Sequence, residues 1–330
     1  MRGIAILLVL GLHWSPAILP GGRWGVDLFL VLSGFLITSL LLQEHAVTGT
    51  IRLLGFWWRR VRRLFPAFAL MLFVVWLFVT LRHEGHRGSI IWSLGYLANY
   101  APKNRLMPEL AHTWSLALEE QFYLVWPPVL LLLLKTCRRA TITAVVALTA
   151  ALVWVHRVHS PVTTYLHPGA TEVRSDGLLF GVLLAFAFTW WGASRWRVWR
   201  FLGIASILIA IHYVLIGDDN GPHCVAAVSA GGAVLIGVAL TSARAASILS
   251  FAPLRWFGLR AYSLYLWHYP ILVALRGRDI NHHDVAVSLL AVPLTLLAAE
   301  ISYRLVESRF RIHARLPAPR STPAADLPQR

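Results

Sequence analysis

The stretch WGVDLFLVLSGFLITSLLLQE, residues 24–44, decides the class of fold. It is long enough for an α-helix to cross the roughly 30 Å hydrocarbon core of a bilayer. Its only formally charged side chains are an aspartate near the start and a glutamate at the end. Such a segment is typical of a transmembrane helix.

The rest of the chain has the same character. Of its 330 residues 57% are hydrophobic and 14% charged, and the mean hydropathy is +0.63, whereas about a quarter of a soluble domain is charged. We therefore expect an all-α integral membrane protein, a bundle of about ten transmembrane helices. The expected spans are residues 4–20, 24–44, 64–81, 113–134, 141–156, 174–191, 199–216, 223–241, 262–275 and 285–305.

Two further segments are set apart by composition. The aromatic stretch 90–101 is too short to span, so we expect one additional interfacial or re-entrant helix there. Residues 311–330 are basic and rich in proline, which predicts a disordered cytoplasmic tail after a single transmembrane domain over 1–310.

The net charge of +15 has two possible explanations, nucleic-acid binding or membrane topology. Assigning alternate loops to opposite sides places 20 of the 30 Lys and Arg residues on one side and 8 on the other. The richer side is cytoplasmic by the positive-inside rule. We therefore predict a multi-pass protein of the cell membrane with both termini cytoplasmic, surrounded by membrane lipids, and no nucleic-acid partner.

Charges inside the first hairpin are the leading candidates for function, because ionisable groups in a span are costly. Arg2 and His13 lie on one face of the first helix. The second helix runs back antiparallel to it, so Asp27 near its start should lie at about the same depth in the membrane as His13. Asp27 could hydrogen-bond the imidazole and leave its other nitrogen as a general base. The alternatives are an arginine anchor, a buried histidine and a structural ion pair. Ser33-Gly34 is interpreted as a helix-packing step.

Polar residues of three later spans are further candidates. His112, Ser115 and Glu119 share one face of the fourth span. The adjacent Glu120 is expected to cap the helix or to pair with a basic group such as Arg174. Other candidates for substrate binding are Arg174, Asp176, Trp267 and His268. The alternative to substrate binding is a local salt bridge between Arg174 and Asp176. For His268 the alternative is a hydrogen bond in the core.

Four arginines in five residues, Arg59, Arg60, Arg62 and Arg63, precede the third span. Positive-inside anchoring explains such a cluster by default. The same guanidinium groups suit a ligand with several phosphates. The two cysteines have no metal-site spacing, and no metal is expected.

In their order and spacing these segments resemble the membrane-bound acyltransferase 3 family. The resemblance runs from Arg2 to about Glu307 and is carried by Arg2 with His13 and by residues 25–37, 59–66, 114–123, 174–177 and 262–270. It implies that His13 is essential, that Arg2 is its partner, and that an acyl-CoA, by family habit acetyl-CoA, enters from the cytoplasm. The implied acceptors are saccharides, lipid-linked glycans and macrolides. Glu307-Ser308-Arg309-Phe310 lacks the family's proline and is given no role.

The expected activity is O-acyl transfer from acyl-CoA to an acceptor hydroxyl. CoA phosphates would lie near Arg2 and the arginine cluster, and His13 would act as base, assisted by Asp27 or Glu119. Attack is expected to be direct, without an acyl-enzyme. The alternative is a transporter of glycans or protons with an intramembrane relay of histidines and acids.

Overall fold

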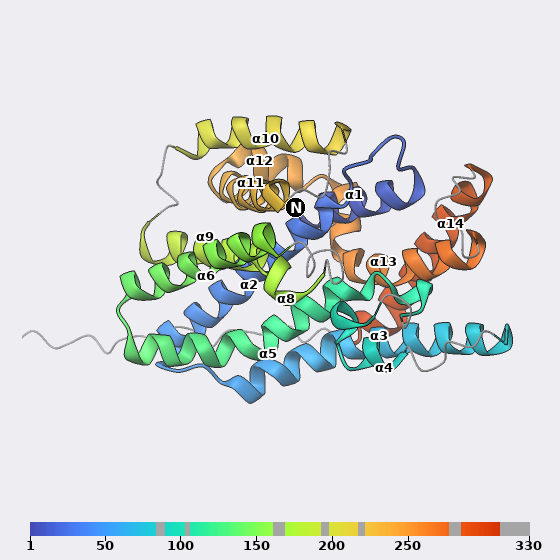
Figure 1. Ribbon diagram of the computed structural model, residues 1–330, viewed down its shortest axis with the longest axis horizontal. Helices are drawn as coiled ribbons and strands as arrows, with labels where there is room; N and C mark the ends of the chain where they lie inside the picture. The colour runs from blue at the N-terminus through green and yellow to red at the C-terminus, as the bar shows by residue number, and fades with distance from the viewer. Residues whose placement is uncertain are drawn as a thin grey trace, which may run out of the picture.

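The computed structural model describes residues 1–83, 90–102, 106–160, 169–192, 198–216, 222–276 and 285–310. Within these ranges all regular structure is helical, which confirms the predicted class (Figure 1). The α-helices are α1 (Arg2–Trp14), α2 (Trp24–Thr48), α3 (Leu53–Leu81), α4 (Ile90–Leu94), α5 (Thr113–Thr136), α6 (Arg139–His159), α8 (Thr171–Arg174), α9 (Asp176–Trp190), α10 (Trp199–Ile216), α11 (Pro222–Thr241), α12 (Ala243–Leu249), α13 (Ala252–Arg276) and α14 (Val285–Ser302). The turns η2 (Ala98–Tyr100) and η3 (Pro108–Leu110) are 3₁₀-helical, and η5 (Tyr303–Glu307) is π-helical. The predicted tail, 311–330, lies outside the described residues.

Six helices of the described part are long and apolar enough to cross a membrane. They are Trp24–Thr48, Leu53–Leu81, Thr113–Thr136, Arg139–His159, Cys224–Thr241 and Ala286–Glu307. Apolar helices at Arg2–Trp14, Asp176–Trp190 and Phe201–His212 are shorter. Every predicted span coincides with a helix, but the count of about ten crossings is not confirmed, and the orientation stays a prediction.

The boundaries of three helices differ from the predicted ones by six residues or more. α13 begins at Ala252, ten residues early. α1 ends at Trp14, six residues before the expected end, because Pro16 disfavours helix in the residue before it and chain reversal follows. α3 begins at Leu53, eleven residues early. Arginine is a good helix former, so the arginine cluster continues the helix beyond the apolar stretch that hydropathy marks.

α2 is the central helix and packs most extensively against α9, with α1, α5 and α11 also in contact. Glycines allow the close approach to α9. A β-carbon on Gly34 would lie 2.0 Å from the Leu178 carbonyl oxygen, and one on Gly181 would lie 2.2 Å from that of Val31. The predicted packing step at Ser33-Gly34 is confirmed, and it fixes the face that α2 presents to the site.

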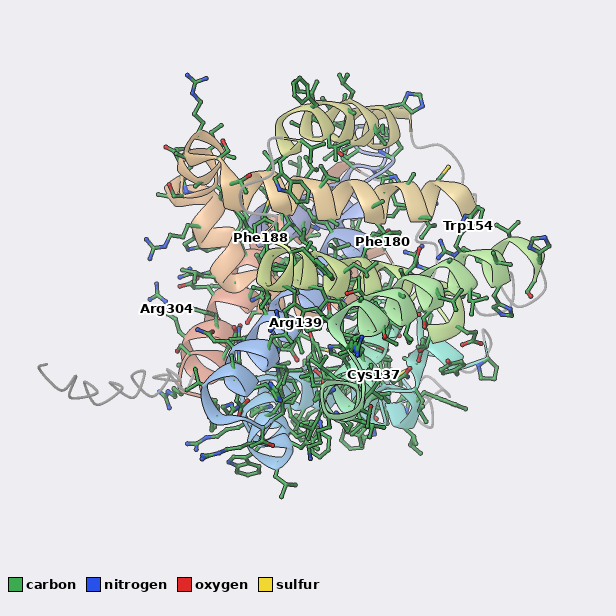
Figure 2. All side chains as sticks on the ribbon, turned by 90° about the vertical axis from the view of Figure 1, so that its left-hand side faces the viewer. Cys137, Arg139, Trp154, Phe180, Phe188 and Arg304 are labelled. Carbon is green, nitrogen blue, oxygen red and sulfur yellow. The ribbon has the colours of Figure 1, made fainter. Side chains whose placement is uncertain are left out.

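The outside of the bundle is apolar. Large side chains such as Leu132 on α5, Leu152 on α6 and Phe201 on α10 are more than half exposed. Trp154 projects outward from α6, and Arg304 reaches away from the end of the bundle (Figure 2). Such a surface needs lipid around it, which supports a multi-pass membrane protein.

The stretch after α4 is held on the bundle by a polar network. The Gln121 side chain of α5 donates to the Asn99 side chain at 2.9 Å and to the Tyr96 carbonyl at 2.8 Å. Thr171 of α8 donates to Gln121. α4 has five residues and η2 three, so neither crosses a bilayer, and the predicted non-spanning segment is confirmed.

Candidate active site

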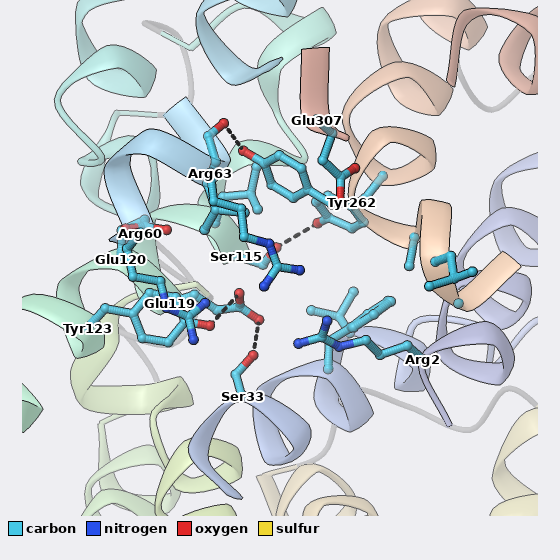
Figure 3. Close-up of a pocket in the computed structure, with 18 residues that line it drawn as sticks. Arg2, Ser33, Arg60, Arg63, Ser115, Glu119, Glu120, Tyr123, Tyr262 and Glu307 are labelled. Carbon is cyan, nitrogen blue, oxygen red and sulfur yellow. Dashed lines mark hydrogen bonds between the residues drawn. The ribbon is translucent and has the colours of Figure 1, made fainter. Parts of the chain in front are cut away.

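A cavity of about 90 Å³ lies between α1, α2, α3, α5, α13 and η5 (Figure 3). Its charged lining consists of arginines and glutamates from four of these elements: Arg2, Arg60, Arg63, Glu119, Glu120 and Glu307. Apolar side chains, among them Val26, Phe29 and Leu116, line it as well. Segments separated by up to three hundred residues therefore build one amphipathic cavity.

Charged and apolar residues line this cavity together. Ser115, Leu116 and Glu119 come from α5, and Phe29 and Ser33 come from α2. Arg2 begins α1, and Arg60 and Arg63 lie within α3 (Figure 3). A ligand that carries both anionic and apolar groups matches this lining.

Glu119 lies among the arginines of the cavity (Figure 3). Its carboxylate accepts hydrogen bonds from the Ser33 hydroxyl at 3.0 Å and the Tyr123 hydroxyl at 3.2 Å (Figure 3). Tyr123 follows it by four residues on the same helix face, and Ser33 belongs to α2. These partners hold Glu119 towards the arginines, so the structure does not bring it to His13 as an imidazole partner.

Two of the four clustered arginines face the cavity. Arg60 and Arg63 are three residues apart on α3 and line it together. The Arg60 guanidinium lies 4.5 Å from the centre of the Tyr123 ring. Arg59 instead lies 3.8 Å from Glu44 with 43% of its side chain exposed, and Arg62 is exposed. Arg2 lines the same cavity from α1, so three of the five predicted arginines share it, and their role in phosphate binding stays a prediction.

Three histidines meet beside the cavity. The His13 ring centre lies 5.0 Å from that of His268 and 5.1 Å from that of Tyr269. His112 lies 5.5 Å from His268. His13, His112 and His268 come from α1, from the residue before α5 and from α13, and the sequence had proposed all three. Within the described residues no group of three or more His, Cys, Asp or Glu side chains could hold a metal ion.

The backbone fixes how His13 presents its ring. Nδ1 lies 2.8 Å from the Val9 carbonyl oxygen, which can only accept a hydrogen bond. Nδ1 of the neutral ring therefore carries the proton, and Nε2 keeps its lone pair. His268 follows the same pattern, with Nδ1 2.7 Å from the Tyr265 carbonyl oxygen and a buried Nε2 without a hydrogen-bond partner.

The end of α1 that carries His13 is anchored by α13 and α14. Arg276 donates to the His13 carbonyl at 3.2 Å and to the Ser288 hydroxyl at 2.8 Å. Ser288 in turn donates to the Trp14 carbonyl at 2.8 Å. These bonds satisfy carbonyls that a helix end leaves without partners, so the imidazole is held in place.

Tyr265 separates the arginine cavity from the histidines. Its hydroxyl donates to the His112 carbonyl at 2.9 Å and lies 2.6 Å from the Ser115 hydroxyl, which must then be the donor of that second bond. Ser115 and Tyr265 both line the cavity. The Tyr265 ring also contacts the rings of His112 and His268, so the two sites share this side chain as a wall.

Asp27 belongs to a different cluster from the one expected. It is 1% exposed and pairs with Arg174 at 2.8 Å, and no hydrogen bond joins it to His13 among the described residues. Asp176 pairs with Arg157 at 2.6 Å, with both side chains buried. The expected Asp27–His13 pair and the alternative Arg174–Asp176 salt bridge are both wrong, because two buried arginines of α6 and α8 neutralise the aspartates instead.

Trp267 is not among the residues that line the cavity. Its ring packs against an apolar cluster that includes Phe68, Met71 and Leu266. Adjacent residues of α13 point in directions about 100° apart, so a motif that is continuous in sequence divides between core and site.

Residues that the sequence gave no role include two that line the cavity, Tyr265 and Glu307, and Arg157 of the ion pair with Asp176. Tyr265 stood in a recognised motif without a role, and Glu307 had been set aside for a missing proline. Glu307 lines the cavity and accepts a hydrogen bond from Ser263 at 2.9 Å. Arg157 comes one residue after the expected span 141–156, and no pattern in the sequence indicated its buried partner.

Comparison with known proteins identifies the family. The model of an acyltransferase domain matches residues 1–304. The peptidoglycan O-acetyltransferase OatA of Listeria monocytogenes is 32% identical over 94% of this chain and 55% of its own length. The putative peptidoglycan O-acetyltransferase YrhL of Bacillus subtilis is 33% identical over 94% and 54%, and a putative O-acetyltransferase of Staphylococcus aureus is 30% identical over 94% and 56%.

The chain spans about half the length of these curated relatives. No solved structure matches it. The family match covers nearly all of the described helices and both sites, and it agrees with the resemblance drawn from the motifs. The chain belongs to the membrane-bound acyltransferase 3 family.

Proposed function

We propose that the protein is a membrane O-acetyltransferase that moves an acetyl group from acetyl-CoA to a hydroxyl of a cell-envelope saccharide, with His13 as general base. The observation that carries this proposal is the position of Tyr265. It stands between a cavity with three arginines and a histidine cluster in which Nε2 of His13 keeps its lone pair.

The arginines of the cavity suit the phosphates of CoA. Guanidinium groups bind phosphate oxygens through charge-assisted bonds, and Arg2 approaches from α1 while Arg60 and Arg63 approach from α3. Glu119, Glu120 and Glu307 lie among them, so the site holds its arginines without leaving three like charges uncompensated. The acyl thioester would then extend along the apolar lining towards Tyr265.

His13 suits the role of base by its fixed tautomer. Nε2 would take the proton from the acceptor hydroxyl as that oxygen attacks the thioester carbonyl. The carbon–sulfur bond breaks, the new ester forms, and the proton leaves with the CoA thiolate as its thiol. The Val9 carbonyl performs the orienting role that the sequence had given to Asp27.

The acceptor belongs on the histidine side of the wall. Two of the relatives are named for action on peptidoglycan, a polymer with many sugar hydroxyls. His112 and Tyr269 present polar atoms beside His13, and sugar hydroxyls can bond such groups. We therefore propose a peptidoglycan-type glycan as the acceptor, reached from the end of the bundle opposite the arginines.

Purified protein with labelled acetyl-CoA and muramyl oligosaccharides tests the proposal. We expect covalent label in the glycan, and His13→Gln should lose about 100- to 10,000-fold of that rate. His159→Gln, on the exposed end of α6, is the matched control. Full activity of His13→Gln would refute the base. Movement of unmodified glycan without ester formation would favour the transporter alternative.

A further inference from the structure

A second cavity, of about 310 Å³, lies beside α10 and is called the α10 cavity below. Its lining comes from α10, α11 and α12 and from the starts of α1 and α2. Among the described helices α10 packs extensively only against α11, and it lies at the edge of the bundle (Figure 1). The α10 cavity is therefore the space that remains where α10 faces α1 and α2 without packing closely on them.

The lining of the α10 cavity is apolar. Of the described side chains that line it, only those of Ser206 and Trp24 carry a nitrogen or oxygen atom. A buried water needs about two to four polar partners, so this lining does not hold water. An empty space would forfeit dispersion contacts of its walls. Hydrocarbon is the occupant that such a lining suits.

The α10 cavity communicates with the apolar outside of the bundle. Ile207 and Ile209 of α10 and Ile248 of α12 line it, and all three are exposed. The outward side of α10 presents Phe201 and Leu208, which are more than half exposed. A hydrocarbon chain of a surrounding lipid can therefore enter beside α10 without crossing a polar layer.

Two arginines flank the end of the α10 cavity that α12 lines. Arg244 belongs to α12 itself. Arg255 follows Leu254, whose carbonyl oxygen packs against Gly3 too closely for a β-carbon to fit there. Two residues before Gly3, Met1 lines the cavity and packs against the last turns of α11, which α12 follows directly. The start of α1, α12 and both arginines therefore lie at one end.

Neither arginine has a carboxylate partner in the described part of the chain. Arg244 and Arg255 are exposed and take part in no ion pair there, whereas Arg260 of α13 pairs with Glu300. Residues 222–276 contain no Asp or Glu. An anionic group is the complement that these two guanidinium groups lack.

We propose that the α10 cavity binds one acyl chain of an anionic phospholipid, with the phosphate of that lipid against Arg244 and Arg255. The topology expected from the sequence puts these arginines at the cytoplasmic leaflet, which is rich in anionic lipid. The cavity takes part of one chain, and the rest of the lipid stays in the bilayer. Because α1 forms one wall, the bound lipid braces the helix that carries Arg2 and His13.

Native mass spectrometry of the full chain tests the proposal. The protein in detergent is offered equal amounts of dioleoyl-phosphatidylglycerol, dioleoyl-phosphatidylcholine and undecaprenyl phosphate, and the lipid that survives removal of the detergent is identified by its mass. We expect the parent to retain phosphatidylglycerol. Arg244→Gln and Arg255→Gln should each lower its preference over phosphatidylcholine about fivefold, which corresponds to about 1 kcal/mol per basic residue. The matched control is Arg138→Gln, an exposed arginine before α6, a helix that does not line the cavity, and it should keep the parent preference.

Variants that fill the cavity test the site of the chain separately from the site of the phosphate. Gly231 lines the cavity, and a β-carbon there would lie 3.9 Å from the Ser206 side chain, an ordinary contact. Gly231→Leu should therefore fold and lose the retained lipid. Leu208→Phe adds volume on the outward side of α10 and should retain it. Should Gly231→Leu fail to fold, Ala210→Leu fills the same cavity from α10.

Each contrary result overturns a stated part of the proposal. Equal retention of phosphatidylglycerol and phosphatidylcholine by the parent overturns the phosphate site. Undiminished retention by the cavity-filling variants overturns the cavity as the site of the chain. Preferential retention of undecaprenyl phosphate overturns the phospholipid as the occupant. Because lipid retention is measured without acetyl transfer, the proposed function is not at stake in this experiment.

Discussion

The Asp27–Arg174 ion pair gives the sharpest test of the structure, because the sequence assigns Asp27 to catalysis and the structure to helix packing. The two side chains are 1% and 14% exposed, and their charged atoms are 2.8 Å apart. Removing one partner of a buried pair costs about 3–5 kcal/mol, since the other charge stays buried. For Arg174→Ala the loss includes its position over the Trp114 ring, 5.5 Å away, which adds about 0.5–2 kcal/mol.

A double-mutant cycle measures this coupling. We expect Asp27→Ala and Arg174→Ala each to unfold at a lower temperature in detergent, and the double variant to lose less than the sum by about 1–3 kcal/mol. The matched control is Glu44→Ala, whose exposed partner Arg59 lies at 3.8 Å, and its effect should stay below about 1 kcal/mol.

The transferase activity of the same variants decides the role. If Asp27 acts through packing, the folded fraction of Asp27→Ala keeps its kcat. A variant with parental stability whose kcat has dropped by about 100-fold or more would refute this reasoning and return Asp27 to the catalytic set.

Two other expectations follow from the site and the packing. Arg60→Gln should weaken CoA binding about 10- to 100-fold by calorimetry, since a charge-assisted hydrogen bond contributes about 1.5–3 kcal/mol. Arg62→Gln, on the exposed face of α3, should bind CoA as the parent does. Equal effects of the two variants would contradict the cavity as the phosphate site. Gly34→Val should lower the free energy of unfolding by about 1–3 kcal/mol or more, as overpacking of a core does, because its β-carbon would lie 2.0 Å from the Leu178 carbonyl oxygen. An unchanged unfolding temperature would contradict this helix contact.

Much of the fold could be predicted because lipid imposes a simple rule on sequence. Apolar stretches of sufficient length become helices, and the packing step at Gly34 was visible as a pair of small residues. The ends of the helices were harder to predict. The apolar stretch of the third span begins only after the arginine cluster, whereas the helix α3 includes the cluster and begins at Leu53.

The candidate site was predicted residue by residue but not as a geometry. The sequence named His13, His112 and His268 separately, and their meeting depends on how α1 and α13 cross. Asp27 was matched to His13 by depth alone. Depth along a helix says nothing about which way a side chain points around it, and Asp27 points to Arg174.

The hydrogen bond between Ser115 and Tyr265 also bears on the membrane as a permeability barrier. Polar groups stand on both sides of it, with Glu119 in the cavity and His112 in the histidine cluster. If the pair separated fully, water could follow these groups through an otherwise apolar bundle, and protons would follow the water. The mechanism that we propose therefore requires the acyl group to pass Tyr265 without opening a path for ions across the membrane.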